Sequence, residues 1–171
     1  AKKQWCTIAV IETASHWIKM HRVWWIQYDV LALTNITQDH LDLHWTMEDY
    51  VNTKLSIFQK LITYNRKRWV KKIAIINNES NYKDLFINET YDILYTYSTS
   101  IASSFTAYDI KYELDKTSFT VNLPWTDLKI ESPLKWEFNV QNILAAIWVF
   151  MALWVDKDNI VSSIKEIKTI A

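Results

Sequence analysis

The residues with the greatest capacity for chemistry lie in one polar stretch, from Asp29 to Lys54. A short apolar run at positions 30–33 is followed by the turn T-N-I-T, and a predicted helix begins near Thr46. In open α/β sheets, ligands bind just beyond the carboxyl ends of the strands. We therefore expect a ligand site here, and the alternative is a capped loop with solvated charges. The polar side chains of this stretch are Asn35, Asp39, His40, Asp42 and His44.

Four other short motifs accompany this stretch. They are E-T-A-S-H at 12–16, H-R-V at 21–23, H-W-T-M-E-D-Y at 44–50 and F-N-V-Q-N at 138–142. Together with T-N-I-T-Q-D-H-L-D at 34–42, their order and spacing resemble the Mur ligases, above all the UDP-N-acetylmuramoyl-tripeptide synthetase type. The resemblance covers most of the chain and is weakest between residues 82 and 126. It implies an ATP-dependent ligase that adds a diamino acid to UDP-MurNAc-L-Ala-D-Glu in peptidoglycan precursor synthesis, through an acyl phosphate.

The same resemblance implies that Glu12, His40 and Lys54 hold Mg²⁺, and that His40 and Lys54 take part in catalysis. Magnesium prefers hard oxygen ligands. Glu12 supplies them directly, whereas Lys54 does so only as a carbamate formed with carbon dioxide. Carbamate formation requires a neutral amine, which burial of the Lys54 side chain would favour. Without the family, the alternatives are a surface Glu, a hydrogen-bonded core His and an exposed helical Lys.

Substrate contacts are also implied by the resemblance. Arg22 matches an arginine that contacts the UDP-MurNAc-dipeptide, and its forked guanidinium suits a carboxylate or phosphate because it donates two parallel hydrogen bonds. Ser15 and His16 match the last two residues of the family's S-S-H motif. Ala14 replaces the first serine and has no hydroxyl to hydrogen-bond the substrate.

Nucleotide contacts are implied at three asparagines. Asn139 and Asn142 match the adenine contacts of the F-N-x-x-N motif, and an amide can both donate to and accept from an adenine edge. The alternative for Asn139 is helix capping. Asn35 is expected to fix its turn and to contact a metal-bound water. The stretch Asn78-Glu79-Ser80 receives no role.

Composition bounds the class of protein. Half of the 171 residues are hydrophobic, which is enough for a core. The net formal charge is zero, so no nucleic-acid partner is expected. A single cysteine, Cys6, excludes an intrachain disulfide and fits a reducing, cytoplasmic compartment. The longest apolar run, Ile143 to Leu153, is too short to cross a bilayer, so we expect no membrane contact. We also expect a monomer.

The hydrophobic pattern predicts an α/β fold. Buried parallel strands are expected at 6–12, 28–33, 73–76 and 93–97, with helices between them. Two-residue alternation from 104 to 130 predicts three antiparallel strands in a small meander. Helices are predicted at 46–65, 140–153 and 157–169, and the basic run 66–72 predicts a solvated turn. The expected fold is a mostly parallel sheet flanked by helices, with a small antiparallel β meander.

We expect residues 1–171 to form the later part of a Mur ligase central, ATP-binding domain. The sequence has no G-K-[ST] phosphate loop, and its start at A-K-K-Q without Met suggests an excised piece. The amino- and carboxy-terminal domains of the family are missing from it. We therefore expect the fragment alone to be inactive. A non-catalytic nucleotide-binding or interaction module on the same fold is the alternative, and the sequence does not distinguish diaminopimelate from lysine.

Glycine is absent from the chain, and ten residues are Trp. At an average usage of about 7%, a chain of this length holds roughly a dozen glycines. Trp125 follows a proline where a turn favours glycine, and Trp154 ends an apolar helical run where a cap glycine is usual. We hypothesise that most of the Trp residues stand for Gly, through a UGA codon that the source reads as Gly. The alternative is a genuinely Trp-rich protein. Similar positions are Trp17, Trp25, Trp45, Trp69 and Trp136.

Overall fold

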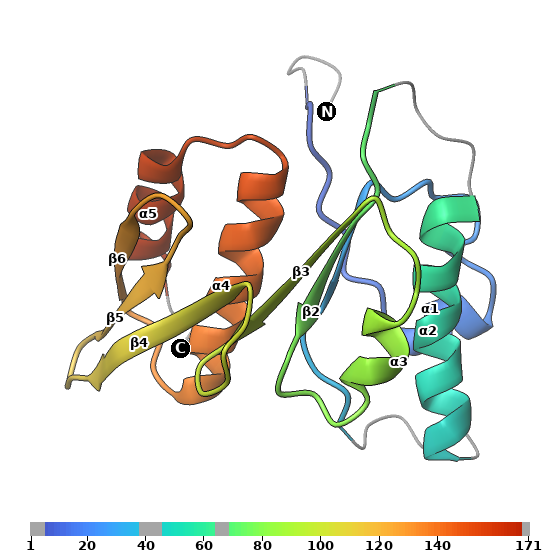
Figure 1. Ribbon diagram of the computed structural model, residues 1–171, viewed down its shortest axis with the longest axis horizontal. Coiled ribbons are helices and arrows are strands. Elements are labelled where there is room, and N and C mark those ends of the chain that lie inside the picture. The colour runs from blue at the N-terminus through green and yellow to red at the C-terminus, as the bar shows by residue number, and fades with distance from the viewer. Residues whose placement is uncertain (1–5, 38–45, 64–68, 169–171) are drawn as a thin grey trace.

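A six-stranded sheet is flanked by helices in the computed structural model, which describes residues 6–37, 46–63 and 69–168 (Figure 1). Helices cover both faces of its parallel part and one face of its antiparallel part. The strands are β1 (Val30–Leu33), β2 (Ile73–Asn77), β3 (Ile93–Ser98), β4 (Phe105–Tyr112), β5 (Thr117–Asn122) and β6 (Asp127–Ser132). The helices are α1 (Ser15–Lys19), α2 (Met47–Thr63), α3 (Lys83–Ile87), α4 (Glu137–Ala152) and α5 (Lys157–Lys165).

The strands follow one another in sequence order, from β1 at one end to β6 at the other. Pairing is parallel from β1 to β4 and antiparallel from β4 to β6. The predicted mostly parallel sheet with an antiparallel meander is therefore confirmed. All five residues of β2 are buried, as expected for a strand covered on both faces.

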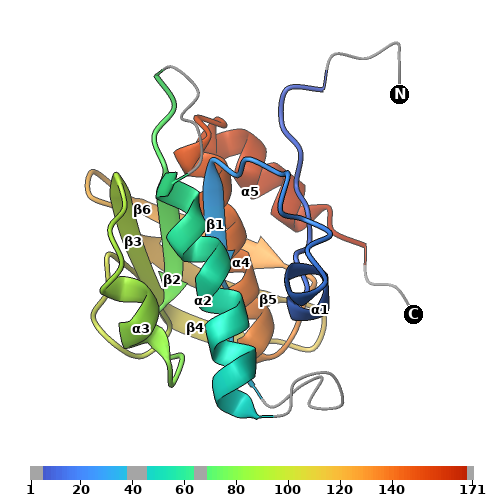
Figure 2. The same cartoon turned by 90° about the vertical axis from the view of Figure 1, so that its right-hand side faces the viewer.

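Two hydrophobic cores form on the two faces of the sheet. On one face α4 packs against β1, β2 and β3, and Val140, Leu144 and Ile147 are fully buried there. On the other face α2 and α3 cover β1 and β2, with Leu61 and Phe86 at the centre. Figure 2 shows α2 in front of β1, with α4 behind the sheet. The carboxyl ends of β1, β2 and β3 consequently meet at one edge between two helical layers.

Two predicted helix starts are confirmed by their capping hydrogen bonds. The backbone N–H of Asp49 donates to Thr46 Oγ1 at 3.1 Å, which fixes the start of α2. Asp156 Oδ1 accepts from the N–H groups of Asp158 and Asn159 at 2.9 and 3.3 Å. Such side-chain acceptors satisfy N–H groups that have no partner within the helix.

The expectation of a buried strand at residues 6–12 is wrong. This segment lies outside the sheet and is mostly exposed, and the side chain of Val10 is 72% exposed. Its β-branched composition favours an extended backbone, but a strand also needs a hydrogen-bonded neighbour. Within the described residues, β1 is the end strand of the sheet and pairs only with β2.

Positive φ angles occur at five described residues that are not glycine: His21 (59°), Trp69 (72°), Asp109 (52°), Trp136 (76°) and Trp154 (62°). His and Asp are enriched in this region, whereas a bulky residue there is an outlier. Asp109 lies where the β4–β5 register shifts. The three tryptophans lie at or next to chain reversals and helix ends, where glycine is the usual residue.

Candidate functional site

The carboxyl ends of three parallel strands are joined by one hydrogen-bond network. Asn77, the last residue of β2, donates from Nδ2 to the carbonyl of Thr34 at 2.7 Å and to Gln141 Oε1 at 3.3 Å. Its Oδ1 accepts from the N–H of Glu79 at 2.9 Å. Thr34 follows β1, and Gln141 lies in the first turns of α4. The network therefore ties two strand ends to the start of that helix.

Glu79 extends this network to the loop after β3. Its Oε1 accepts from Ser98 Oγ at 2.5 Å, from the backbone N–H groups of Thr99 and Ser100 at 2.5 and 3.2 Å, and from Thr99 Oγ1 at 3.0 Å. Its Oε2 accepts from Gln141 Nε2 at 2.7 Å. Burial raises the pKa of the Glu79 carboxyl, but the hydrogen bonds from Ser98, Thr99 and Ser100 outweigh it, so the net pKa lies below its ordinary value.

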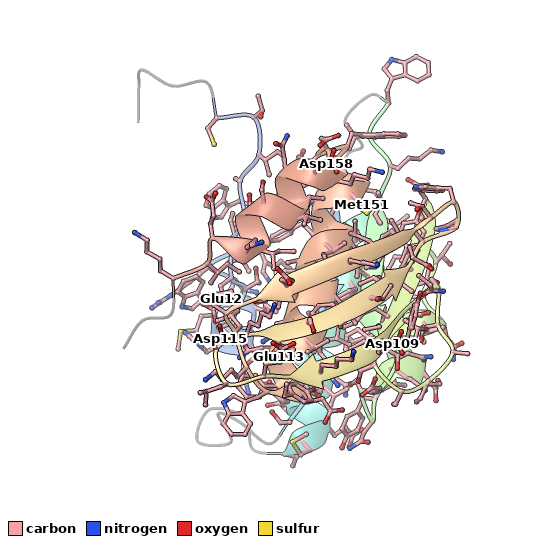
Figure 3. The ribbon with its side chains drawn as sticks, turned by 90° about the vertical axis from the view of Figure 1, so that its left-hand side faces the viewer. Glu12, Asp109, Glu113, Asp115, Met151 and Asp158 are labelled. Carbon is pink, nitrogen blue, oxygen red and sulfur yellow. The ribbon has the colours of Figure 1, made fainter. Side chains whose placement is uncertain are left out.

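A cavity of about 800 Å³ lies between the segment before α1, strand β1 and helix α2. Three of the predicted site residues, Glu12, Ser15 and Lys54, line it. Ser15 is buried, Lys54 is half-buried and Glu12 is exposed. Figure 3 labels Glu12 on the extended segment, outside the sheet. The structure thus brings two of the three predicted metal residues, Glu12 and Lys54, to one cavity, although Glu12 does not follow a strand as expected.

Lys54 lies on the third turn of α2, with its Nζ 5.1 Å from the ring centroid of Tyr50. An ammonium over a ring face is attracted by the ring quadrupole, so the aromatic ring holds the Lys54 side chain on the cavity side of the helix. The third predicted metal residue, His40, lies outside the described residues, as do Asp39, Asp42 and His44.

The described residues fit Mg²⁺ only through Glu12. No group of three His, Cys, Asp or Glu side chains among the described parts of the chain is arranged to hold a metal. Magnesium does not require such a cage, because it keeps several waters and binds through one or two carboxylates plus substrate phosphates. One carboxylate on a cavity wall is compatible with that chemistry, and Lys54 adds an oxygen ligand only if it is carbamylated.

The predicted substrate residues are divided between the cavity and the surface. Ser15 lines the cavity, whereas His16 and Arg22 do not. His16 packs edge-on against the Trp17 ring, with ring centroids 5.7 Å apart. Arg22 is exposed, and its backbone N–H donates to the carbonyl of Trp17 at 2.9 Å. Its guanidinium is available to a ligand on the surface beside α1.

The predicted nucleotide residues do not converge on the cavity. Asn139 donates from Nδ2 to the carbonyl of Lys135 at 2.6 Å, so its amide braces the turn into α4. Asn142 is exposed one turn further along. Asn35 Oδ1 accepts from the N–H of Ile36 at 2.8 Å, in the turn after β1. A hollow of about 480 Å³ lies at the start of α4, lined by Trp136, Glu137, Phe138 and Gln141.

Sequence reasoning missed Glu79 and Gln141, the centre of the network. One signal was available: Glu79 follows a fully buried strand by two residues, at the edge where parallel strands present ligand-binding groups. Gln141 offered no signal, because it stands between the two asparagines of the matched motif and only packing shows that it faces the sheet.

An α/β sheet with a polar edge between two helical layers defines a ligand-binding domain, and comparison with known proteins identifies its family. The Mur ligase middle domain model matches residues 1–150. The chain therefore belongs to the Mur ligase family. No helix within the described ranges is long and apolar enough to cross a membrane.

Individual relatives share the family assignment. The chain is 36% identical over 147 residues to UDP-N-acetylmuramyl-tripeptide synthetase 2 of Oceanobacillus iheyensis, covering 86% of the chain and 29% of the relative. It is 34% identical over 159 residues to UDP-N-acetylmuramoyl-L-alanyl-D-glutamate–2,6-diaminopimelate ligase of Bacillus cereus, covering 92% and 32%. The solved structure of a ligase of the latter name gives a TM-score of 0.80 at 24% identity, over 93% of the chain and 32% of that structure. The chain spans about a third of the length of these relatives.

Proposed function

We propose that the parent protein is an ATP-dependent ligase that joins a diamino acid to UDP-MurNAc-L-Ala-D-Glu. The observation that carries the proposal is the shared cavity of Glu12 and Lys54, in a chain of the Mur ligase family. Relatives of nearly equal similarity are named as diaminopimelate ligases and as a lysine ligase. The proposal therefore names a diamino acid and no particular one. ATP and nucleotide-linked precursors would be met in the cytoplasm.

The chain is proposed to be the later part of the central domain. Its relatives are about three times longer, and the sequence contains no phosphate loop.

The proposed reaction has two steps. The substrate carboxylate attacks the γ-phosphorus of ATP, which releases ADP and gives an acyl phosphate. The amine of the diamino acid then attacks the acyl carbon, and phosphate leaves. When bound, Mg²⁺ supplies charge neutralisation for the phosphate oxygens. Glu12 would hold it at the cavity wall, with Lys54 as carbamate and His40 completing the set.

The remaining residues bind and orient. Arg22 would pair its guanidinium with an anionic group of the UDP-MurNAc-dipeptide, because its fork matches a carboxylate or phosphate. Ser15 would donate to the same substrate from the cavity, with His16 beside it. Asn142 is proposed to meet the adenine edge, with Asn139 and Asn35 bracing the turns on either side.

The test uses the full-length protein supplied with ATP, the UDP-MurNAc-dipeptide and either diamino acid. We expect phosphate release that depends on the dipeptide and the amino acid together, and no release from the 171-residue chain alone. The Lys54→Ala variant should lose the activity, and the matched control Lys60→Ala, further along the same helix, should keep it. ATP binding without phosphate release in the full-length protein would instead identify the non-catalytic nucleotide-binding module.

A further inference from the structure

We infer that the natural residue at positions 69, 136 and 154 is glycine. Trp154 follows the end of α4 with φ of 62°. Its N–H donates to the carbonyl of Met151 at 3.0 Å, and the N–H of Val155 donates to the carbonyl of Phe150 at 3.0 Å. These two bonds form the Schellman motif, whose left-handed residue is usually glycine because it carries no Cβ.

Trp136 gives the same indication at the other end of α4. Its φ of 76° and ψ of 148° lie next to a region that only glycine populates readily. No side chain caps this helix start. Trp136 also lines the hollow at the start of α4, together with Gln141.

The burial of the tryptophans supports the inference independently of backbone angles. Seven of the eight described tryptophans are exposed, with Trp69 at 89% and Trp154 at 94%, although Trp is a highly buried residue on average. They lie on α1, on connecting segments and at both ends of α4, and so form no single docking face. The exposed tryptophans therefore have similar positions in the chain, but they do not form a common surface.

The buried tryptophan, Trp148, is too large for the space that it occupies. The ring centroids of Trp148 and Phe105 are 2.9 Å apart, whereas aromatic pairs lie about 4.5–7 Å apart. Trp148 Nε1 is buried without an acceptor among the described residues. A side chain of much smaller volume would suit this position of α4.

The test is to sequence the gene of the source organism and to analyse the protein isolated from it. We expect UGA codons at positions 69, 136 and 154, and glycine in the corresponding peptides by mass spectrometry of the protein isolated from that source. UGG codons at these positions, or tryptophan in those peptides, would overturn the inference. Glycine at these positions but not at Trp148 would leave the three-site inference intact.

Independently of the tryptophans, the geometry points to Glu79 as a positioning residue for the proposed nucleotide site, and this second inference rests on the proposed function. One oxygen of the Glu79 carboxylate accepts hydrogen bonds from the loop after β3, and the other accepts one from the Gln141 amide. Gln141 lies between Asn139 and Asn142 on the first turns of α4. Glu79 therefore fixes the helix that carries both asparagines against the carboxyl edge of the sheet.

The exchange of donor and acceptor tests this role directly. In Glu79→Gln, the new amide can still accept from Ser98 and Thr99, but its NH₂ group faces the NH₂ group of Gln141. The pair Glu79→Gln with Gln141→Glu restores one donor and one acceptor across the same contact. It also keeps an acceptor for Asn77 Nδ2, which now bonds Gln141 Oε1 at 3.3 Å.

The assay measures KM for ATP and kcat in the full-length protein. We expect Glu79→Gln to raise KM for ATP roughly tenfold with a smaller change in kcat, since a hydrogen bond to a charged group is lost, and the exchanged pair to recover most of the loss. The control is Glu131→Gln on β6, which changes an acceptor that lies 2.9 Å from Lys116 Nζ. This variant should leave KM for ATP unchanged. An unchanged KM in Glu79→Gln, or no recovery in the pair, refutes the positioning role. An inactive unmodified protein would refute the proposed function itself.

Discussion

In protein made with tryptophan at positions 69, 136 and 154, replacing these three residues of positive φ by glycine should stabilise the fold. A non-glycine residue in the left-handed region costs roughly 1–2 kcal/mol. Glycine offsets about 0.4–1 kcal/mol of this stabilisation at each site, because it raises the conformational entropy of the unfolded chain. The indoles of Trp69, Trp136 and Trp154 are 69–94% exposed, so their removal forfeits little apolar burial. The balance is a stabilisation of roughly 2 kcal/mol for the triple variant.

Calorimetry of the full-length protein measures this gain. For a domain of this size, about 2 kcal/mol raises Tm by roughly 4–8 °C. The matched control is Trp125→Gly. Trp125 was expected at a turn that favours glycine, but it is not among the described residues of positive φ, and it is 70% exposed. Glycine there should lower Tm slightly through the unfolded state. A triple variant that is no more stable than the control would refute the argument that these positions require glycine.

Three further predictions follow from individual contacts. The low pKa of Glu79 means that its contribution to stability is complete above its unfolded value of 4.5 and is lost as pH falls through the folded value. The Tm difference between the unmodified protein and Glu79→Gln should therefore shrink in acid, and a constant difference would contradict this. Lys54→Ala should lower kcat by about 10²–10³-fold, with partial recovery on adding a short carboxylic acid if a carbamate is the active form; recovery by alkylamines alone would argue against it. Asp156→Ala should cost about 1 kcal/mol in urea unfolding by removing the cap of α5, whereas the exposed control Asp115→Ala should not.

The sequence determined most of the architecture. Short β-branched runs separated by amphipathic segments specify parallel strands with crossover helices, and alternation after residue 104 specifies the antiparallel meander. Caps such as Thr46 and Asp156 were readable because their side chains bond to backbone groups two or three residues away. Such local interactions depend on spacing along the chain and require no knowledge of the packing.

The basic run before β2 contains a buried residue that the local sequence pattern did not predict. The sequence predicts a solvated turn at 66–72, yet Lys72 is fully buried, with its Nζ 3.1 Å from Asp29 Oδ1. Its backbone N–H donates to Asp92 Oδ2 at 2.8 Å. Both partners lie far away in the sequence, so only strand pairing brings them to this lysine and offsets the cost of burying its charge.

Of the candidate site, the sequence alone supplied the residue types, and the tertiary structure decided which of them meet. Glu12, Ser15 and Lys54 share a cavity because α2 crosses beside the segment that precedes α1. The segment 6–12 has the composition of a strand but no partner, since strand formation depends on a neighbour that composition cannot provide. The absence of glycine was visible from the letters alone, but the positive φ at Trp69, Trp136 and Trp154 became evident only once the chain was folded, because backbone angles are set by the path between packed elements.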